Sequence, residues 1–186
     1  MDHDIDRILI PQGRIAARVG ELARQITADL ASPDNTVQAG EITIIPIMTG
    51  AMIFTADLIR QIPIALRIGL LTVSSYPGKS VTSQGPVVLR EQLGDVAGRR
   101  LLVVDDVLDS GRTLGAVVPM LRSLGAATVR SCVLLRKDRP EAQATPIDYV
   151  GFDIPDVFIV GYGLDYDNYY RNLPDIVTLK AHAAGQ

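Results

Sequence analysis

The chain has few of the residues that form disulfides and metal clusters: among its 186 residues are one cysteine and two histidines. A single cysteine, Cys132, excludes a disulfide within the chain, and its place in an apolar run is typical of a small buried side chain. His3 and His182 lie near opposite ends of the sequence. The sequence therefore excludes a disulfide scaffold and offers no histidine cluster for a metal.

Excess positive charge and long apolar segments are also missing. The 18 Lys and Arg residues are outnumbered by 21 Asp and Glu residues, which gives a net charge of −3. Broad nucleic-acid binding needs a surplus of cations. No apolar run approaches the ~20 residues that cross a bilayer, and residues 1–4 lack the basic and apolar regions of a signal peptide. We expect a cytoplasmic protein that binds neither nucleic acid nor membranes.

Apolar segments alternate between the patterns of strands and of helices. Apolar residues at steps of three and four predict an amphipathic helix over residues 15–30. Nearly continuous apolar runs predict buried strands. Strands are expected at Ile42–Met48 and residues 64–73, 101–104, 129–135, 157–160 and 176–179, and further helices over residues 51–60 and 113–124. The alternation predicts one α/β domain over residues 1–186, with a mainly parallel sheet flanked by helices.

Residues 74–90 depart from this alternation. Ser, Gly, Pro and Thr dominate the segment, and its apolar residues follow no period. A segment of about this length without regular structure is usually a functional loop or a disordered one. We expect a flexible loop here.

The most informative segment begins at the strand of residues 101–104. The strand ends in two acids, a third acid follows three residues later, and a Ser-Gly-Arg-Thr run opens a helix: Asp105, Asp106, Asp109, Ser110, Gly111, Arg112 and Thr113. Ligands of open α/β sheets bind beyond the carboxyl ends of the strands. These side chains are therefore expected at a ligand site.

The two halves of this segment suit different parts of one ligand. A glycine, two hydroxyls and the free amides of a helix start suit a phosphate. Asp105 and Asp106 would repel a bare phosphate, but they accept hydrogen bonds from sugar hydroxyls and help to hold hydrated Mg²⁺. A helix cap would explain Asp109 alone. A ribose 5-phosphate with a metal-bound diol fits both halves.

The segment resembles the phosphoribosyl-diphosphate-binding motif of the type I phosphoribosyltransferases, which is a hydrophobic strand, two acids, two apolar residues and Asp-Ser/Thr-Gly-Arg/Lys-Thr. Every position of the motif is filled. Residues 151–166 and 170–174 closely resemble the nucleobase-binding region of hypoxanthine-guanine phosphoribosyltransferases, and residues 8–11 and the helix after them are also similar to that family. The resemblance covers nearly the whole chain.

The resemblance implies a type I phosphoribosyltransferase fold, with a small hood subdomain built from the N-terminal and C-terminal segments. It implies a purine salvage enzyme that transfers phosphoribosyl from phosphoribosyl diphosphate to hypoxanthine or guanine, giving IMP or GMP and pyrophosphate. It also implies Mg²⁺ as the cofactor and assembly as a homodimer or homotetramer.

Roles for the acids follow from the same resemblance. Asp109 would act as the general base, a role worth typically 10²–10⁴ in rate, and residues 109–113 would bind the 5′-phosphate. Asp105 and Asp106 would hold the ribose and, indirectly, the metal. Asp165 would lie at the purine and help to bind a second Mg²⁺.

The purine would be held by three further residues. Lys137 would donate to the 6-oxo group, Phe158 would stack on the ring, and the backbone of Ile159 would meet the base edge. Adenine is disfavoured because its 6-amino group would face a cation. Without the resemblance, Phe158 would be assigned to the core and Lys137 to a solvated surface.

Thr49, Gly50 and Arg171 would bind pyrophosphate, and Ser75 and Tyr76 match the Ser-Tyr that opens the family's flexible loop. The family's pyrophosphate loop commonly has Leu-Lys-Gly-Gly, often with a cis peptide before the Lys, whereas residues 48–51 are Met-Thr-Gly-Ala. Because the backbone amide makes that contact, we expect pyrophosphate binding to survive and a cis Met48–Thr49 bond to be possible.

Two other functions are compatible with this fold. One is a non-catalytic regulator that senses a nucleotide and binds RNA or DNA, against which Asp109 and the acidic balance speak. The other is a phosphoribosyltransferase for xanthine, adenine or a pyrimidine. The sequence does not rank hypoxanthine, guanine and xanthine, and Asp165 and Arg171 could also form an ordinary surface ion pair.

Overall fold

The computed structural model describes residues 2–30, 42–74 and 87–180. Its main sheet has the strand order β5-β4-β2-β6-β7-β8, and the short β3 also pairs with β2. All neighbours in this order are parallel except β4 and β5. The strands are β2 (Ile42–Met48), β3 (Arg67–Ile68), β4 (Leu70–Ser74), β5 (Val87–Gln92), β6 (Arg100–Leu108), β7 (Thr128–Lys137) and β8 (Tyr149–Ile154). The expected mainly parallel α/β sheet is confirmed.

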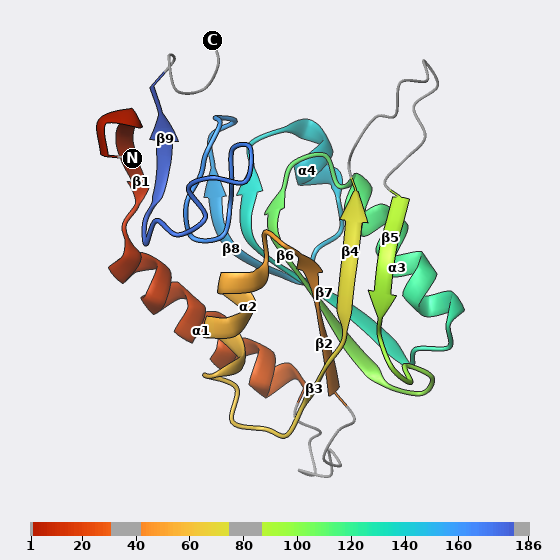
Figure 1. Ribbon diagram of the computed structural model, residues 1–186. Coiled ribbons are helices and arrows are strands. Elements are labelled where there is room, and N and C mark those ends of the chain that lie inside the picture. Colours follow the sequence, from red (N-terminus) through yellow and green to blue (C-terminus); the bar gives the residue numbers. More distant parts are fainter. Residues whose placement is uncertain (1, 31–41, 75–86, 181–186) are drawn as a thin grey trace, which may run out of the picture.

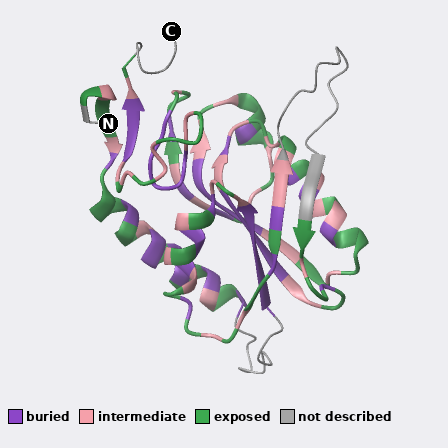
Figure 2. Cartoon of the chain, viewed as in Figure 1, coloured by how far each residue is buried: buried purple, intermediate pink, exposed green. Residues whose placement is uncertain are grey.

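Helices cover both faces of this sheet (Figure 1). The helices are α1 (Gln12–Leu30), α2 (Met52–Ile59), α3 (Arg112–Ser123) and the short α4 (Pro140–Ala144). Ile42 and Ile44 pack with α1 and α2, whereas Ile45 and Ile47 pack with α3. The apolar side chains on each face of the sheet are therefore buried under the helices of that face. Figure 2 shows the central strands largely buried.

The two ends of the described chain meet in a second, two-stranded sheet. β1 (Ile5–Ile10) pairs antiparallel with β9 (Ile176–Leu179), and Ile8 lies opposite Val177. A short 3₁₀ helix, Asp2–Asp4, precedes β1. The N-terminal and C-terminal segments expected to form a hood thus lie side by side at one end of the main sheet (Figure 1).

Two sequence-based expectations about strands are wrong. Residues 157–160 form no strand, and Val160 makes only an isolated bridge to Val177. The strand in this region is β8, whose apolar pattern is interrupted by Gly151 and Asp153. Residues 64–73 hold two strands, β3 and β4, separated at Gly69.

The predicted loop at residues 74–90 is shorter than expected, because Val87–Gln92 form β5 and pair antiparallel with β4. Residues 75–86, with Ser75 and Tyr76, lie outside the described part of the chain, so their flexibility stays a prediction. β1 and α4 are additions that the sequence pattern did not indicate. Among the described residues, no helix is long and apolar enough to cross a membrane.

Candidate functional site

A cavity of about 1060 Å³ opens at the carboxyl ends of β2 and β6. The lining comes from the ends of β2 and β4, the segment from β6 into α3, and the turn that follows residue 164. Its residues are 47–50, 72–73, 105–114, 139, 165, 167, 168 and 171. The predicted ribose, phosphate and pyrophosphate residues therefore surround one space, at the sheet edge where α/β proteins bind ligands.

Asp105 and Asp106 form an acidic pair at the floor of this cavity. Asp105 is buried, its Oδ1 accepts the Asp106 amide at 3.0 Å, and Asp106 Oδ1 accepts the Val107 amide at 2.7 Å. Burial, and then the charge of Asp106, raise the pKa of Asp105 well above its usual value. Burial also raises the pKa of Asp106. Burial and mutual repulsion destabilise the charged form of these two carboxyls. A ligand that brings positive charge or hydroxyl donors would stabilise that form.

This pair fits a hard divalent cation in its donor chemistry, since carboxylate oxygens are preferred ligands of Mg²⁺. Within residues 2–30, 42–74 and 87–180, no group of three or more His, Cys, Asp or Glu side chains could hold a metal ion. Asp105 and Asp106 could therefore hold Mg²⁺ only together with water or with oxygens of a bound substrate.

The turn from β6 into α3 requires a glycine at position 111. Gly111 has a φ of 71°, and a β-carbon there would lie 2.0 Å from Thr145 Oγ1. No side chain caps the start of α3, so its first amides have no partner inside the helix. Ser110 and Thr113 line the cavity beside these amides, and this combination of donors is chemically suited to a phosphate.

Gly50 is enclosed by other parts of the cavity wall. The Met48–Thr49 peptide before it is cis, as the resemblance suggested. A β-carbon on Gly50 would lie 1.8 Å from Asp106 Oδ2, and one on Gly163 would lie 2.4 Å from Gly50 O. Gly163 also has a φ of 104°. The loop at residues 48–50 thus packs directly on the acidic pair, and only glycine fits at these two positions.

Asp165 and Arg171 contact each other at the rim of the cavity. Arg171 Nη2 lies 2.7 Å from Asp165 Oδ1, and Arg171 Nη1 donates to Gly163 O at 2.7 Å. Asp165 Oδ2 accepts the Asn168 amide at 2.8 Å, and Asn168 Oδ1 also accepts from Arg171. Both oxygens of the predicted second metal ligand are therefore engaged, and the ion pair holds the Arg171 guanidinium beside the acidic pair.

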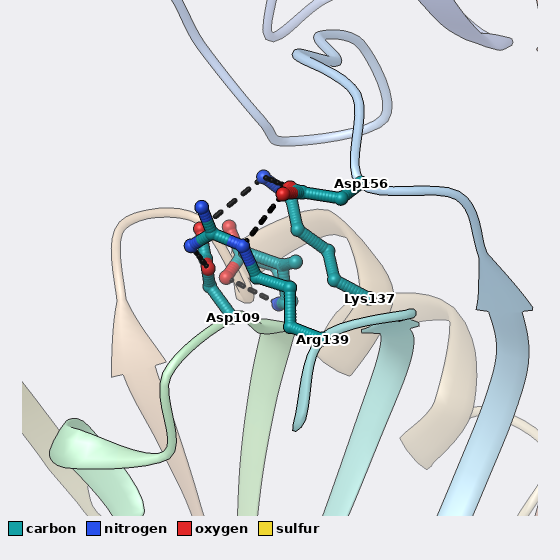
Figure 3. Close-up of polar contacts among 6 residues, drawn as sticks. Asp109, Lys137, Arg139 and Asp156 are labelled. Carbon is teal, nitrogen blue, oxygen red and sulfur yellow. Dashed lines mark hydrogen bonds and ion pairs between the residues drawn. The ribbon is translucent and has the colours of Figure 1, made fainter. Parts of the chain in front are cut away.

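Of the predicted base residues, Lys137 contacts Asp109 directly. Lys137 Nζ is 3.2 Å from Asp109 Oδ2 and 3.3 Å from Asp156 Oδ1 (Figure 3). The Lys137 side chain is only 13% exposed, so it is not a solvated surface charge. Lys137 does not line the cavity itself and reaches it through Asp109.

Phe158 is 49% exposed and not part of the core, in contrast to what its apolar neighbours alone would indicate. Its ring meets that of Tyr166 edge-on, with centroids 5.5 Å apart. The next residue, Ile159, is 5% exposed and packs in the core. Neither residue lines the cavity. The half-exposed ring of Phe158 is therefore accessible to a ligand, whereas Ile159 contributes to the core.

Four residues of this region were missed by the sequence analysis: Arg139, Asp156, Asp167 and Asn168. Arg139 pairs with both Asp109 and Asp156. Asp167 and Asn168 line the cavity, with φ values of 50° and 66°. Asp156 lies within the stretch that resembles the nucleobase-binding region. Arg139 had no signal of its own, because it belongs to the charged run 136–139.

Comparisons with known proteins identify the family of the chain. The pattern of the phosphoribosyl transferase domain matches residues 8–167. The chain is 42% identical to a hypoxanthine-guanine phosphoribosyltransferase of Mycobacterium avium over 180 residues, which are 95% of this chain and 86% of that protein.

Solved structures agree as well. A hypoxanthine-guanine phosphoribosyltransferase from Bacillus anthracis superposes with a TM-score of 0.84 at 34% identity, over 95% of this chain and 99% of that one. Hypoxanthine phosphoribosyltransferase from Trypanosoma cruzi, in complex with the product IMP, superposes with a TM-score of 0.86 at 32% identity, over 96% of each chain. The chain therefore belongs to the phosphoribosyltransferase family, in its hypoxanthine-guanine branch.

Proposed function

We propose that the protein transfers phosphoribosyl from phosphoribosyl diphosphate to hypoxanthine, guanine or both, and releases IMP or GMP and pyrophosphate. The observation that carries the proposal is the shared cavity of the acidic pair Asp105–Asp106, the uncapped start of α3 and the Arg171 guanidinium. Acids suit the sugar diol, amides suit the 5′-phosphate, and a cation suits the diphosphate. Relatives that carry the corresponding names support it.

The sugar phosphate would bind along the segment from β6 into α3. Residues 109–113 would hold the 5′-phosphate through backbone amides and hydroxyls, and Asp105 and Asp106 would accept hydrogen bonds from the ribose hydroxyls. Thr49 and Gly50 would face the pyrophosphate with their backbone, as expected where the usual Lys is absent, and Arg171 would pair with it. In this proposed arrangement, the anomeric carbon would lie between the acidic pair and Asp109.

The purine would lie on the side of Asp109 that faces Lys137. Phe158 has the exposed ring that stacking requires, and stacking of a base on an aromatic ring contributes ~1–3 kcal/mol. Lys137 would donate to a 6-oxo group, and the backbone of Ile159 would meet the base edge. A 6-amino group would face a cation with no acceptor, which disfavours adenine.

Proton transfer falls to Asp109. The purine loses a proton as its nitrogen bonds to the anomeric carbon, and an Asp109 carboxylate beside N7 of the base would accept that proton. Charge develops on the leaving pyrophosphate at the same time, and Arg171 would stabilise it. Water must be excluded while the activated sugar is bound, since it would otherwise be hydrolysed.

We assign Mg²⁺ as the metal, held through Asp105 and Asp106 together with substrate or water oxygens. When bound, it would neutralise the pyrophosphate that leaves. A second Mg²⁺ at Asp165 would require Arg171 to release the carboxylate, because both Asp165 oxygens have partners. A homodimer or homotetramer and a cytoplasmic location stay predictions.

The test is an assay of the purified protein with phosphoribosyl diphosphate, Mg²⁺ and each base in turn. We expect IMP from hypoxanthine and GMP from guanine, with pyrophosphate formed in equal amounts and far less nucleotide from adenine. Xanthine is included because the sequence does not rank it against hypoxanthine and guanine. Formation of no nucleotide from any base would contradict the proposal, and nucleotide from xanthine or adenine alone would replace its substrate.

A further inference from the structure

Beside the cavity, four charged side chains form a closed ring of ion pairs (Figure 3). Asp109 pairs through Oδ1 with Arg139 Nη1 and through Oδ2 with Lys137 Nζ, the latter at 3.2 Å. Asp156 pairs through Oδ1 with the same Nζ at 3.3 Å and through Oδ2 with Arg139 Nε at 2.7 Å. Each carboxylate therefore contacts both cations. We call these four residues the charge ring.

The charge ring is assembled from the ends of three parallel strands. Asp109 follows β6, Lys137 and Arg139 lie at the end of β7 and just beyond it, and Asp156 follows β8. The Arg139 amide donates to Lys137 O at 2.9 Å, which fixes the turn between the two cations. Rearrangement of the ring therefore requires side-chain movement only.

The members differ in how freely they can move. The Lys137 side chain is 13% exposed, whereas those of Arg139 and Asp156 are 42% and 40% exposed. A desolvated ammonium depends on its counterions, while an exposed guanidinium can be hydrated when it leaves one. Arg139 also uses Nη1 for Asp109 and Nε for Asp156, so it can release Asp109 and keep Asp156.

Base binding, as proposed above, needs the Asp109 carboxylate and the Lys137 ammonium, and the charge ring engages both. We propose that Arg139 pairs with Asp109 while the site is empty, and that it thereby competes with the purine for this carboxylate. In this inference, which rests on the proposed function, Asp156 is a positioning residue: it keeps Lys137 in place and retains Arg139 when the contact between Arg139 and Asp109 opens. Entry of the base thus exchanges one partner of Asp109 for another.

Opposite effects of the two charges follow from this arrangement. Without the Arg139 cation, Asp109 has one competitor fewer, and the purine should bind more tightly. Without the Asp156 charge, Arg139 has only Asp109 to pair with, and Lys137 loses one of its two counterions, so the purine should bind less tightly. Exposed ion pairs contribute little, which limits each effect to about 5-fold.

The experiment measures KM for hypoxanthine and kcat at saturating phosphoribosyl diphosphate in Arg139→Gln, Asp156→Asn and the double variant. We expect KM to fall about 2-fold to 5-fold in Arg139→Gln and to rise by a similar factor in Asp156→Asn, with kcat within about 2-fold of the unmodified protein. In the Arg139→Gln background, Asp156→Asn should raise KM by a smaller factor than in the unmodified protein, because the competitor is gone and only the loss of the Lys137 counterion remains.

A matched control pair lies on β7 and β8. Arg136 Nε and Nη2 pair with Asp153 Oδ1 and Oδ2 at 2.6 and 3.2 Å, outside the charge ring. Arg136→Gln and Asp153→Asn should leave KM unchanged. Melting temperatures of all variants distinguish competition for Asp109 from a merely structural role. A structural role would shift the melting temperature and would move KM in the same direction for the Arg139 and Asp156 variants.

An unchanged or raised KM in Arg139→Gln, or an unchanged or lowered KM in Asp156→Asn, overturns the inference. These outcomes differ from failure of the proposed function. If the unmodified protein forms no nucleotide, the activity itself is wrong. If it turns over hypoxanthine and the two KM shifts are not opposite, only the role of the charge ring is wrong.

Discussion

The carboxylate of Asp106 lies against the α-carbon of Gly50, so closely that a β-carbon there would stand 1.8 Å from Asp106 Oδ2. Asp106 cannot move aside freely, since its Oδ1 accepts the Val107 amide at 2.7 Å. Gly50→Ala should therefore displace an acid that the sugar needs, while the buried core stays unchanged. Displacement by about 1 Å can cost on the order of 10²-fold in rate.

The measurement for Gly50→Ala is kcat/KM for phosphoribosyl diphosphate, which we expect to fall about 10-fold to 100-fold. Gly115→Ala is the matched control. A β-carbon at Gly115, inside α3, meets no atom within 4 Å, and this change should leave activity intact and stabilise the helix slightly. Activity of Gly50→Ala equal to that of Gly115→Ala would show that Asp106 has room to move.

Asp105 is predicted to lower the stability of the fold at neutral pH. Burial raises its pKa in the folded protein above that in the unfolded chain, so the folded state holds the proton more tightly. The corresponding stabilisation is present below the unfolded pKa, about 3.9, and is lost as the pH rises through the folded pKa. Asp105→Asn should therefore raise the melting temperature at pH 7 by about 2–4 °C, equivalent to about 1 kcal/mol.

Thermal unfolding of Asp105→Asn and the unmodified protein between pH 5 and pH 8 tests this prediction, and the two curves should converge toward the acidic end. Asp153→Asn should lower the melting temperature slightly and by the same amount across this range. The hydrogen bond from Arg136 lowers the pKa of Asp153, so its small contribution is fully present above the unfolded pKa, about 3.9, and is lost only at a more acidic pH. A lower melting temperature of Asp105→Asn at pH 7 would contradict the burial argument.

Much of the fold could be predicted because its central strands are continuous apolar runs. β2 and β6 are buried on both faces, and the sequence marks them clearly. β8 was not predicted because Gly151 and Asp153 interrupt its apolar run. It forms a strand because it pairs with the neighbouring strand β7. Residues 157–160 were predicted as a strand because they are apolar, but Ile159 and Val160 are buried by packing and not by a sheet ladder.

The candidate site divides in the same way. The segment from Asp105 to Thr113 is a local motif, so consecutive residues were enough to predict that it faces one cavity. The charge ring is not local: Lys137 lies opposite Ile154 in the parallel register of β7 and β8, and only this register brings Asp156 to Lys137. Single-sequence patterns contain no signal for such a register, so Arg139 and Asp156 could not be assigned.

Phe158 should contribute to base binding with little effect on the fold, because its ring is 49% exposed. Loss of aromatic stacking costs ~1–3 kcal/mol, so KM for hypoxanthine in Phe158→Ala should rise about 5-fold to 150-fold. Tyr169→Ala removes a 69% exposed ring that has no role in the proposed base site, so it is the control and should leave KM unchanged. Equal KM values for the two variants would remove Phe158 from the base site.

Asp109→Asn separates the chemical step from the binding of the sugar phosphate. An asparagine keeps the shape of the side chain and an oxygen that accepts hydrogen bonds, but it does not take up a proton at neutral pH. We expect kcat to fall by about 10²–10⁴, with KM for phosphoribosyl diphosphate changed by less than about 5-fold.

The Asp109 side chain is 41% exposed and shares its cations with Asp156, so the melting temperature should stay within a few degrees of that of the unmodified protein. The paired measurement is calorimetric binding of IMP, which needs no proton transfer and should remain detectable in Asp109→Asn. A variant that kept full turnover would exclude Asp109 as the general base and leave its carboxylate as a partner of Lys137 and Arg139 alone.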